Sequence, residues 1–90
     1  MRESEVVLTN RLGLHARAAA KLVRAAKEFE SSVSLECERS GMADAKSILS
    51  VLAIAAAKGT ALRLITEGPD EEQALREIKV LFEEKFGEDQ

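Results

Sequence analysis

The sequence predicts an α+β domain in which helices pack on one face of a four-stranded, mainly antiparallel sheet. Segments of alternating apolar and polar residues, which are typical of half-buried strands, are separated by segments with the apolar period of a helix. Glycine, proline and serine mark the boundaries between these segments. The resulting order is β-α-β-β-α-β-α, and residues 1–90 are expected to form a single domain.

The chain begins with a short strand followed by a helix. Residues 6–8 are apolar and predict the strand, and the polar residues 9–11 end it. From Ala16 onward the apolar residues follow the spacing of one helix face. That face comprises Ala19, Leu22, Val23, Ala26 and Phe29.

A β-hairpin is predicted next. Val33, Leu35 and Cys37 alternate with polar neighbours, which predicts a half-buried strand with Cys37 as a core thiol. Gly41 belongs to a turn signal, and residues 42–44 are expected to complete the hairpin as a short second strand.

The second half of the chain continues with a helix, a strand and a last helix. Residues 47–57 are rich in alanine and predict a short helix, which Gly59 ends. Alternation over residues 62–67 predicts the last strand, and the acidic residues 70–72 suit the first turn of the final helix. The core face of that helix comprises Ala74, Leu75, Ile78, Leu81 and Phe82.

Composition and charge narrow the possible functions. Apolar residues make up 46% of the chain, which excludes a disordered tail as its main state. Residues 6–27 contain five basic residues and no acidic one, whereas the net charge of the whole chain is −3. The basic segment favours an anion or an acidic protein as partner. The acidic remainder, together with the absence of Trp and Tyr, argues against nucleic acid.

The sequence favours a soluble, cytoplasmic monomer. Cys37 is the single cysteine, so no internal disulfide can form, and residues 1–5 lack the apolar core of a signal peptide. The longest apolar stretch is too short to span a bilayer, so no membrane insertion is expected. The single histidine and the single cysteine lie at unrelated positions, so we expect no metal site and no cofactor.

His15 is the candidate nucleophile. It lies at the transition from the first strand to the first helix, where unpaired N–H groups and the helix dipole favour a phosphate. An unperturbed imidazole is largely neutral at pH 7 and can act as a nucleophile. Arg17 can neutralise the charge that develops. The pattern indicates reversible phosphorylation of His15, with a purely structural histidine as the alternative.

The residues around His15 also resemble a known family. The run LGLHARAA at residues 12–19 is followed by KSIL at residues 46–49. These motifs, together with the element order over residues 5–86, closely resemble the HPr family, the histidine-containing phosphocarriers of the phosphoenolpyruvate-dependent phosphotransferase system. The resemblance implies an open-faced β-sandwich fold.

The resemblance also implies roles for individual residues. Members of the family accept a phosphoryl group from phosphorylated enzyme I and pass it to an enzyme IIA. The match places that group on Nδ1 of His15, with Arg17 as its charge-stabilising neighbour. Backbone N–H groups of Ala16 and Arg17 would hold the phosphate oxygens. The chain would then be a relay with a phosphohistidine intermediate rather than a turnover enzyme.

Two further groups of residues match the family. Ser47 matches a serine that a dedicated kinase phosphorylates in some lineages, and it also suits the N-cap of the middle helix. An apolar patch with basic residues around it matches the surface by which the family docks its partners. The predicted docking residues are Ala20, Arg24, Lys27, Ile48, Leu49 and Leu52, with Arg17 and Lys46 at the rim.

Departures from the family pattern leave the pathway open. Ala18 stands where proline is commonest, and the alanine-rich middle segment and the ending at residues 86–89 look like the nitrogen-related branch. Sugar uptake and nitrogen-related regulation are both open. Two other classes of function remain as alternatives. One is a regulatory docking module controlled by phosphorylation at His15 or Ser47, and the other is a domain that binds an anion without transferring it.

Overall fold

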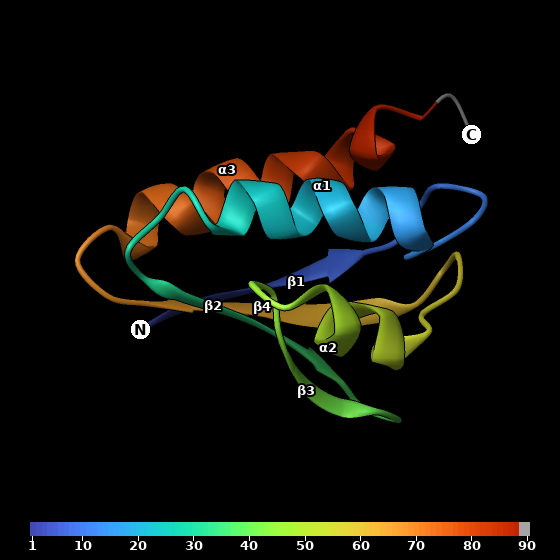
Figure 1. The fold of residues 1–90 in the computed structure, drawn as a ribbon, viewed down its shortest axis with the longest axis horizontal. Coiled ribbons are helices and arrows are strands. Elements are labelled where there is room, and N and C mark those ends of the chain that lie inside the picture. Colours follow the sequence, from blue (N-terminus) through green and yellow to red (C-terminus); the bar gives the residue numbers. More distant parts are fainter. Residues whose placement is uncertain (89–90) are drawn as a thin grey trace.

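The computed structural model describes residues 1–88 and has a four-stranded sheet with its helices on one face (Figure 1). The predicted fold class and the order of elements are confirmed. The elements are β1 (Arg2–Val7), α1 (Ala16–Ala26), β2 (Ser32–Cys37), β3 (Gly41–Asp44), α2 (Ile48–Ile54), β4 (Ala61–Glu67), α3 (Glu71–Glu83) and the short 3₁₀ helix η1 (Lys85–Gly87).

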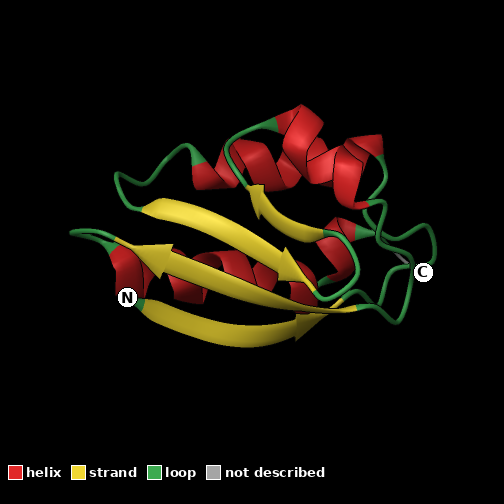
Figure 2. Cartoon of the chain, turned by 90° about the horizontal axis from the view of Figure 1, so that it is seen from below, coloured by secondary structure: helices red, strands yellow, loops and turns green. Residues whose placement is uncertain are grey.

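The strands lie in the order β1-β4-β2-β3, and all neighbouring pairs are antiparallel (Figure 2). The last strand of the chain therefore lies inside the sheet, between β1 and β2. Val6 of β1 is opposite Leu62, and Leu35 of β2 is opposite Leu64. Because opposed residues share a face of the sheet, these apolar side chains form one surface under the helices.

The core lies between that surface and the helices, with α1 and α3 side by side (Figure 1). The predicted face of α1 is buried, and in α3 the positions Ala74, Ile78 and Phe82 are buried while Leu75 and Leu81 are partly buried. Cys37 is only 6% exposed, so its prediction as a core thiol is confirmed. The aliphatic core needs few aromatic rings because small alanines let the helices approach the sheet closely.

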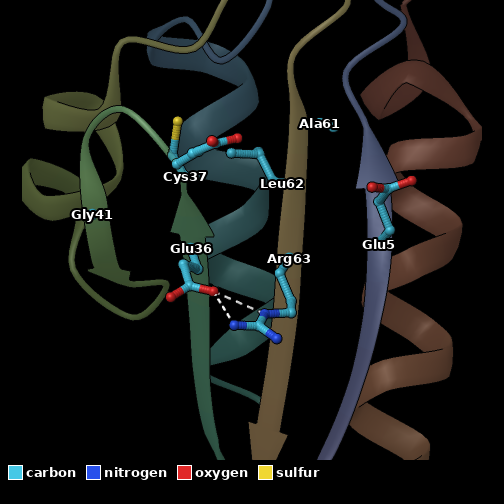
Figure 3. Close-up of a pocket in the computed structure, with 8 residues that line it drawn as sticks. Glu5, Glu36, Cys37, Gly41, Ala61, Leu62 and Arg63 are labelled. Carbon is cyan, nitrogen blue, oxygen red and sulfur yellow. Dashed lines mark hydrogen bonds and ion pairs between the residues drawn. The ribbon is translucent and has the colours of Figure 1, made fainter.

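The opposite face of the sheet is uncovered and charged (Figure 3). Nε of Arg63 donates a hydrogen bond to Glu36 at 2.8 Å, and its Nη1 donates one to Glu3 at 3.1 Å. These two carboxylates, Glu36 foremost, raise the pKa of Arg63. Exposed ion pairs of this kind add little to stability. A hollow on this face contains no residue of the predicted phosphorylation site.

Two element boundaries differ from the prediction near the start of the chain. Strand β1 begins at Arg2 rather than at residue 6, because its polar residues pair with β4 as far as Thr66. Backbone pairing to an existing strand needs no apolar side chain, so the sequence pattern could not mark this start. Helix α1 ends at Ala26, and Phe29 reaches the core from the turn that follows.

Helix α2 is shorter than predicted and ends at Ile54 because Ala55 adopts the left-handed conformation, with φ 53° and ψ 37°. That conformation costs an L-residue about 1–2 kcal/mol.

We expect Ala55→Gly to raise the free energy of unfolding in urea by about 0.5–1 kcal/mol, since glycine lacks the Cβ penalty. Ala53→Gly, at an exposed position inside α2, should lower it by about 1 kcal/mol. If Ala55→Gly and Ala53→Gly lowered the free energy of unfolding equally, the backbone of Ala55 would not be strained.

Candidate functional site

His15 is the N-cap of α1, so it lies at the start of the first helix, as the sequence predicted. Its backbone is extended, with φ −77° and ψ 178°, and its carbonyl oxygen accepts the first helical hydrogen bond from Ala19 at 2.8 Å. The backbone N–H of Arg17 donates to Nδ1 of His15 at 3.2 Å. The imidazole thus takes the capping position that a serine or aspartate oxygen usually fills. This bond holds the ring over the first turn of the helix.

The loop before α1 fixes the position of the histidine backbone. Gly13 has φ +65°, and its N–H donates to the carbonyl of Asn10 at 3.1 Å. Leu14 is buried, and its N–H donates to the carbonyl of Ala56 at 2.9 Å. The loop therefore lies directly against the segment that follows α2, and His15 extends from an anchored backbone.

Glu88 lies against the other ring nitrogen. Its Oε2 is paired with Nε2 of His15, and its Oε1 accepts a hydrogen bond from Nδ2 of Asn10 at 2.9 Å. The hydrogen bond from Asn10 is the main cause that holds the pKa of Glu88 below its ordinary value. Desolvation opposes this shift, and His15 and Arg17 add smaller contributions in the same direction as Asn10. The carboxylate is accordingly charged at neutral pH.

The start of α1 combines a candidate nucleophile with groups that can stabilise an anion. The side chain of His15 is 20% exposed, while those of Ala16 and Arg17 are exposed beside it. Nδ1 accepts a hydrogen bond in this arrangement, so it holds a lone pair rather than a proton. A lone pair next to helix N–H groups and a guanidinium is suited to accept and hold a phosphoryl group.

Ser47 is the N-cap of α2, which confirms the predicted capping role. Its Oγ accepts a hydrogen bond from the N–H of Ser50 at 3.3 Å, and the residue is partly buried. The hydroxyl lies directly before the two large apolar side chains of α2 that are exposed. Ile48 is 39% exposed and Leu49 is 78% exposed. A change at Ser47 would therefore alter the surface next to these side chains.

The predicted docking residues lie on α1 and α2, which pack against each other, except for Lys27, which is the C-cap directly after α1. Arg24 and Lys27 are exposed, and Ala20 and Leu52 are partly buried. Lys46 is not a free rim residue, because its Nζ donates to the carbonyl of Phe29 at 2.8 Å and so binds the turn that follows α1. The exposed apolar part of the patch is thus carried mainly by Ile48 and Leu49.

Comparison with known proteins agrees with this geometry. The family model described as the PTS HPr component phosphorylation site matches residues 2–84. The chain belongs to the HPr family. Phosphocarrier protein HPr of Xylella fastidiosa strain 9a5c is 44% identical over 89 residues, which cover 99% of each chain. Phosphocarrier protein NPr of Escherichia coli K12 is 38% identical over 84 residues, which cover 93% of each chain.

A solved member of the HPr family has nearly the same fold. The crystal structure of HPr-C-His from Thermoanaerobacter tengcongensis superposes with a TM-score of 0.95, at 37% identity and over 100% of both chains. Membership of the HPr family supports a role as a phosphoryl carrier of the phosphotransferase system, with partners such as enzyme I and enzyme IIA. Both HPr and NPr are among the relatives, so the comparisons leave the branch open.

Two residues of the site are not marked by any pattern in the sequence. Asn10 is one of the polar residues that follow the first strand, yet it is fully buried. Glu88 is 73 positions from His15 in the sequence, and no local pattern links them. Within residues 1–88 no group of three or more His, Cys, Asp or Glu side chains could hold a metal ion. The same residues include no helix long and apolar enough to cross a membrane.

Proposed function

We propose that Nδ1 of His15 accepts a phosphoryl group from phosphorylated enzyme I and that the chain passes this group to an enzyme IIA in the cytoplasm. The observation that carries the proposal is the hydrogen bond from the Arg17 N–H to Nδ1. This bond requires Nδ1 to be unprotonated, so that its lone pair lies at the exposed start of α1. A basic nitrogen at a helix N-terminus is well placed both to attack phosphorus and to hold the product.

The transfer needs no atom beyond those of donor and acceptor. The lone pair of Nδ1 forms the new N–P bond, the bond between phosphorus and the donor breaks, and its electron pair stays on the donor. The N–H of Arg17 then turns from Nδ1 to a phosphate oxygen, joined by the N–H of Ala16 and the guanidinium of Arg17. Backbone donors and a dipole of modest strength hold the group without making onward transfer steeply unfavourable.

The decisive test is the intact mass of the protein after incubation with phosphoenolpyruvate and enzyme I. We expect the wild-type chain to gain one acid-labile phosphoryl group and His15→Ala to gain none. Absence of the gain in the wild type would contradict the proposal, and a gain in His15→Ala would contradict the site. Stable phosphorylation that no enzyme IIA removes would favour a regulatory docking module. Noncovalent phosphate binding alone would favour an anion-binding domain.

Docking is proposed to use the exposed apolar residues of α2, with Ala20, Leu52, Arg24 and Lys27 around them. We expect Leu49→Asp to lower kcat/KM for phosphorylation by enzyme I roughly tenfold, because Leu49 is the most exposed large apolar side chain among the described residues. Met42→Asp is the matched control. Met42 is 58% exposed and opposite Glu36, so it faces the uncovered side of the sheet. Equal losses of kcat/KM in Leu49→Asp and Met42→Asp would contradict docking through α2.

Ser47 is proposed as a site of regulation by a dedicated serine kinase. Its hydroxyl lies at the N-terminus of α2, next to Ile48 and Leu49. A phosphate there would add about −1.5 to −2 charges to the docking surface. This charge would repel an acidic partner and reduce the rate at which His15 is phosphorylated.

A further inference from the structure

Asn10, Glu88 and His15 form a chain of hydrogen bonds that ends at the ring nitrogen the proposed transfer does not use. Asn10 donates to Oε1 of Glu88, and Oε2 of the same carboxylate is paired with Nε2 of His15. The side chain of Glu88 is only 15% exposed and that of His15 is 20% exposed. A carboxylate behind a reacting imidazole controls which of its nitrogens carries the proton.

The partners of the ring decide where its proton lies. Nδ1 faces the N–H of Arg17, which can only donate, so Nδ1 is unprotonated. Nε2 faces a carboxylate, which can only accept when charged, so Nε2 carries the proton. The depressed pKa of Glu88 supports its charged state. The network thus fits one tautomer, the neutral ring with its hydrogen on Nε2.

Asn10 fixes the carboxylate in turn. Its Nδ2 donates to Glu88 at 2.9 Å and to the carbonyl of Gly13 at 2.7 Å, so both hydrogens face acceptors and the amide cannot turn over. The residue is fully buried, and its Oδ1 has no hydrogen-bond partner in the described part of the chain. An unpaired buried acceptor is costly. The two hydrogen bonds that Nδ2 donates offset the loss of a partner for Oδ1.

The segment that carries Glu88 is anchored by packing as well. Phe86 is 1% exposed, and its ring meets that of Phe82 edge to face with centroids 5.0 Å apart. Nζ of Lys21 donates to the carbonyl of Phe86 at 2.6 Å, and the N–H of Glu88 donates to the carbonyl of Lys85 at 3.0 Å. Glu88 therefore reaches His15 from a backbone tied to both α1 and α3.

We infer that Glu88, oriented by Asn10, is a positioning residue for phosphoryl acceptance that keeps the proton on Nε2 and the lone pair on Nδ1. This inference rests on the proposed function. When Nδ1 forms the N–P bond, the donor leaves with its electron pair and Nε2 keeps its hydrogen, so the ring gains positive charge. The charged carboxylate faces that hydrogen and stabilises the charge without taking the proton.

Glu88→Gln separates this role from simple anchoring. The single oxygen of the new amide would accept from Asn10, so its NH₂ group would face Nε2 and favour the tautomer protonated on Nδ1. Glu88→Ala removes both contacts but lets water accept from Nε2. A positioning role therefore predicts that Glu88→Gln is more harmful than Glu88→Ala, whereas an anchoring role predicts the reverse. Glu84→Gln, at an exposed position on the same segment, is the matched control.

The experiment combines ¹⁵N chemical shifts of the His15 ring in the unphosphorylated protein with the rate of phosphorylation by enzyme I. We expect the wild type and Glu84→Gln to show the Nε2-protonated tautomer and equal rates. Glu88→Gln should shift the tautomer toward Nδ1 and slow phosphorylation about 10- to 100-fold. An unchanged tautomer and rate in Glu88→Gln would overturn the inference, as would a greater loss in Glu88→Ala. A wild type that is never phosphorylated would sink the proposed function, and the tautomer shift would then decide the role of Glu88 by itself.

Discussion

Replacing Phe86 by alanine is expected to lower the free energy of unfolding by about 3–5 kcal/mol. The side chain is 1% exposed and packs edge to face on Phe82. Its backbone has φ 55°, in the left-handed region that a bulky residue rarely adopts. The chain tolerates this strain because burial of the ring more than offsets it. Once the ring is removed, the strain remains and its compensation is lost.

The measurement is urea denaturation of Phe86→Ala beside Val80→Ala. Val80 lies on α3 and is 39% exposed, so its truncation should change the free energy of unfolding by about 0.5 kcal/mol or less. We also expect Phe86→Ala to slow phosphorylation of His15, because the segment that carries Glu88 loses its anchor. Similar stabilities for the two variants would show that the ring of Phe86 does not hold this segment.

The position of Phe86 shows where sequence patterns stop being informative. It follows Phe82 by four residues, the spacing of a continuing helix face. The structure instead ends α3 at Glu83, and Phe86 enters the core from a 3₁₀ turn. Both arrangements bury the ring, so local periodicity cannot separate them. The choice depends on contacts with Lys21 and Phe82 that form only in the folded chain.

Features whose cause is local could be predicted. The caps at His15 and Ser47, the buried alternation of β2 and the core face of α1 each depend on residues a few positions apart. Asn10 and Glu88 could not be found in this way, because they are 78 positions apart and neither lies in a periodic segment. The position of the proposed nucleophile at the start of α1 could therefore be predicted from the sequence, whereas the groups that contact its ring could be found only in the tertiary structure.

The second large effect is expected at Gly13, where alanine should lower the free energy of unfolding by about 2 kcal/mol or more. A Cβ there would lie 2.5 Å from the carbonyl oxygen of Ala56 and 2.9 Å from Cα of Ala57. Both are backbone atoms, so no side chain can rotate away to relieve the contact. The glycine also has φ +65°, which adds strain for any L-residue.

The same substitution should reach the site through the backbone. The carbonyl of Gly13 accepts from Asn10 at 2.7 Å, and the next residue, Leu14, donates to Ala56 at 2.9 Å. Relief of the clash requires the loop to move away from Ala56, which displaces both bonds and with them the support of Glu88 and His15. We therefore expect Gly13→Ala to slow phosphorylation by enzyme I even at temperatures where the variant is fully folded.

Gly41→Ala is the control that isolates the clash from the backbone conformation. Gly41 has φ +83°, but a Cβ there would have no neighbour within 4 Å. The free energy of unfolding of Gly41→Ala should fall by about 1 kcal/mol because of the left-handed conformation alone. Its rate of phosphorylation by enzyme I should stay unchanged. Urea denaturation and the rate with enzyme I then separate the two causes. If Gly13→Ala behaved like Gly41→Ala in both measurements, the close approach of the loop to Ala56 would not be what holds His15 in place.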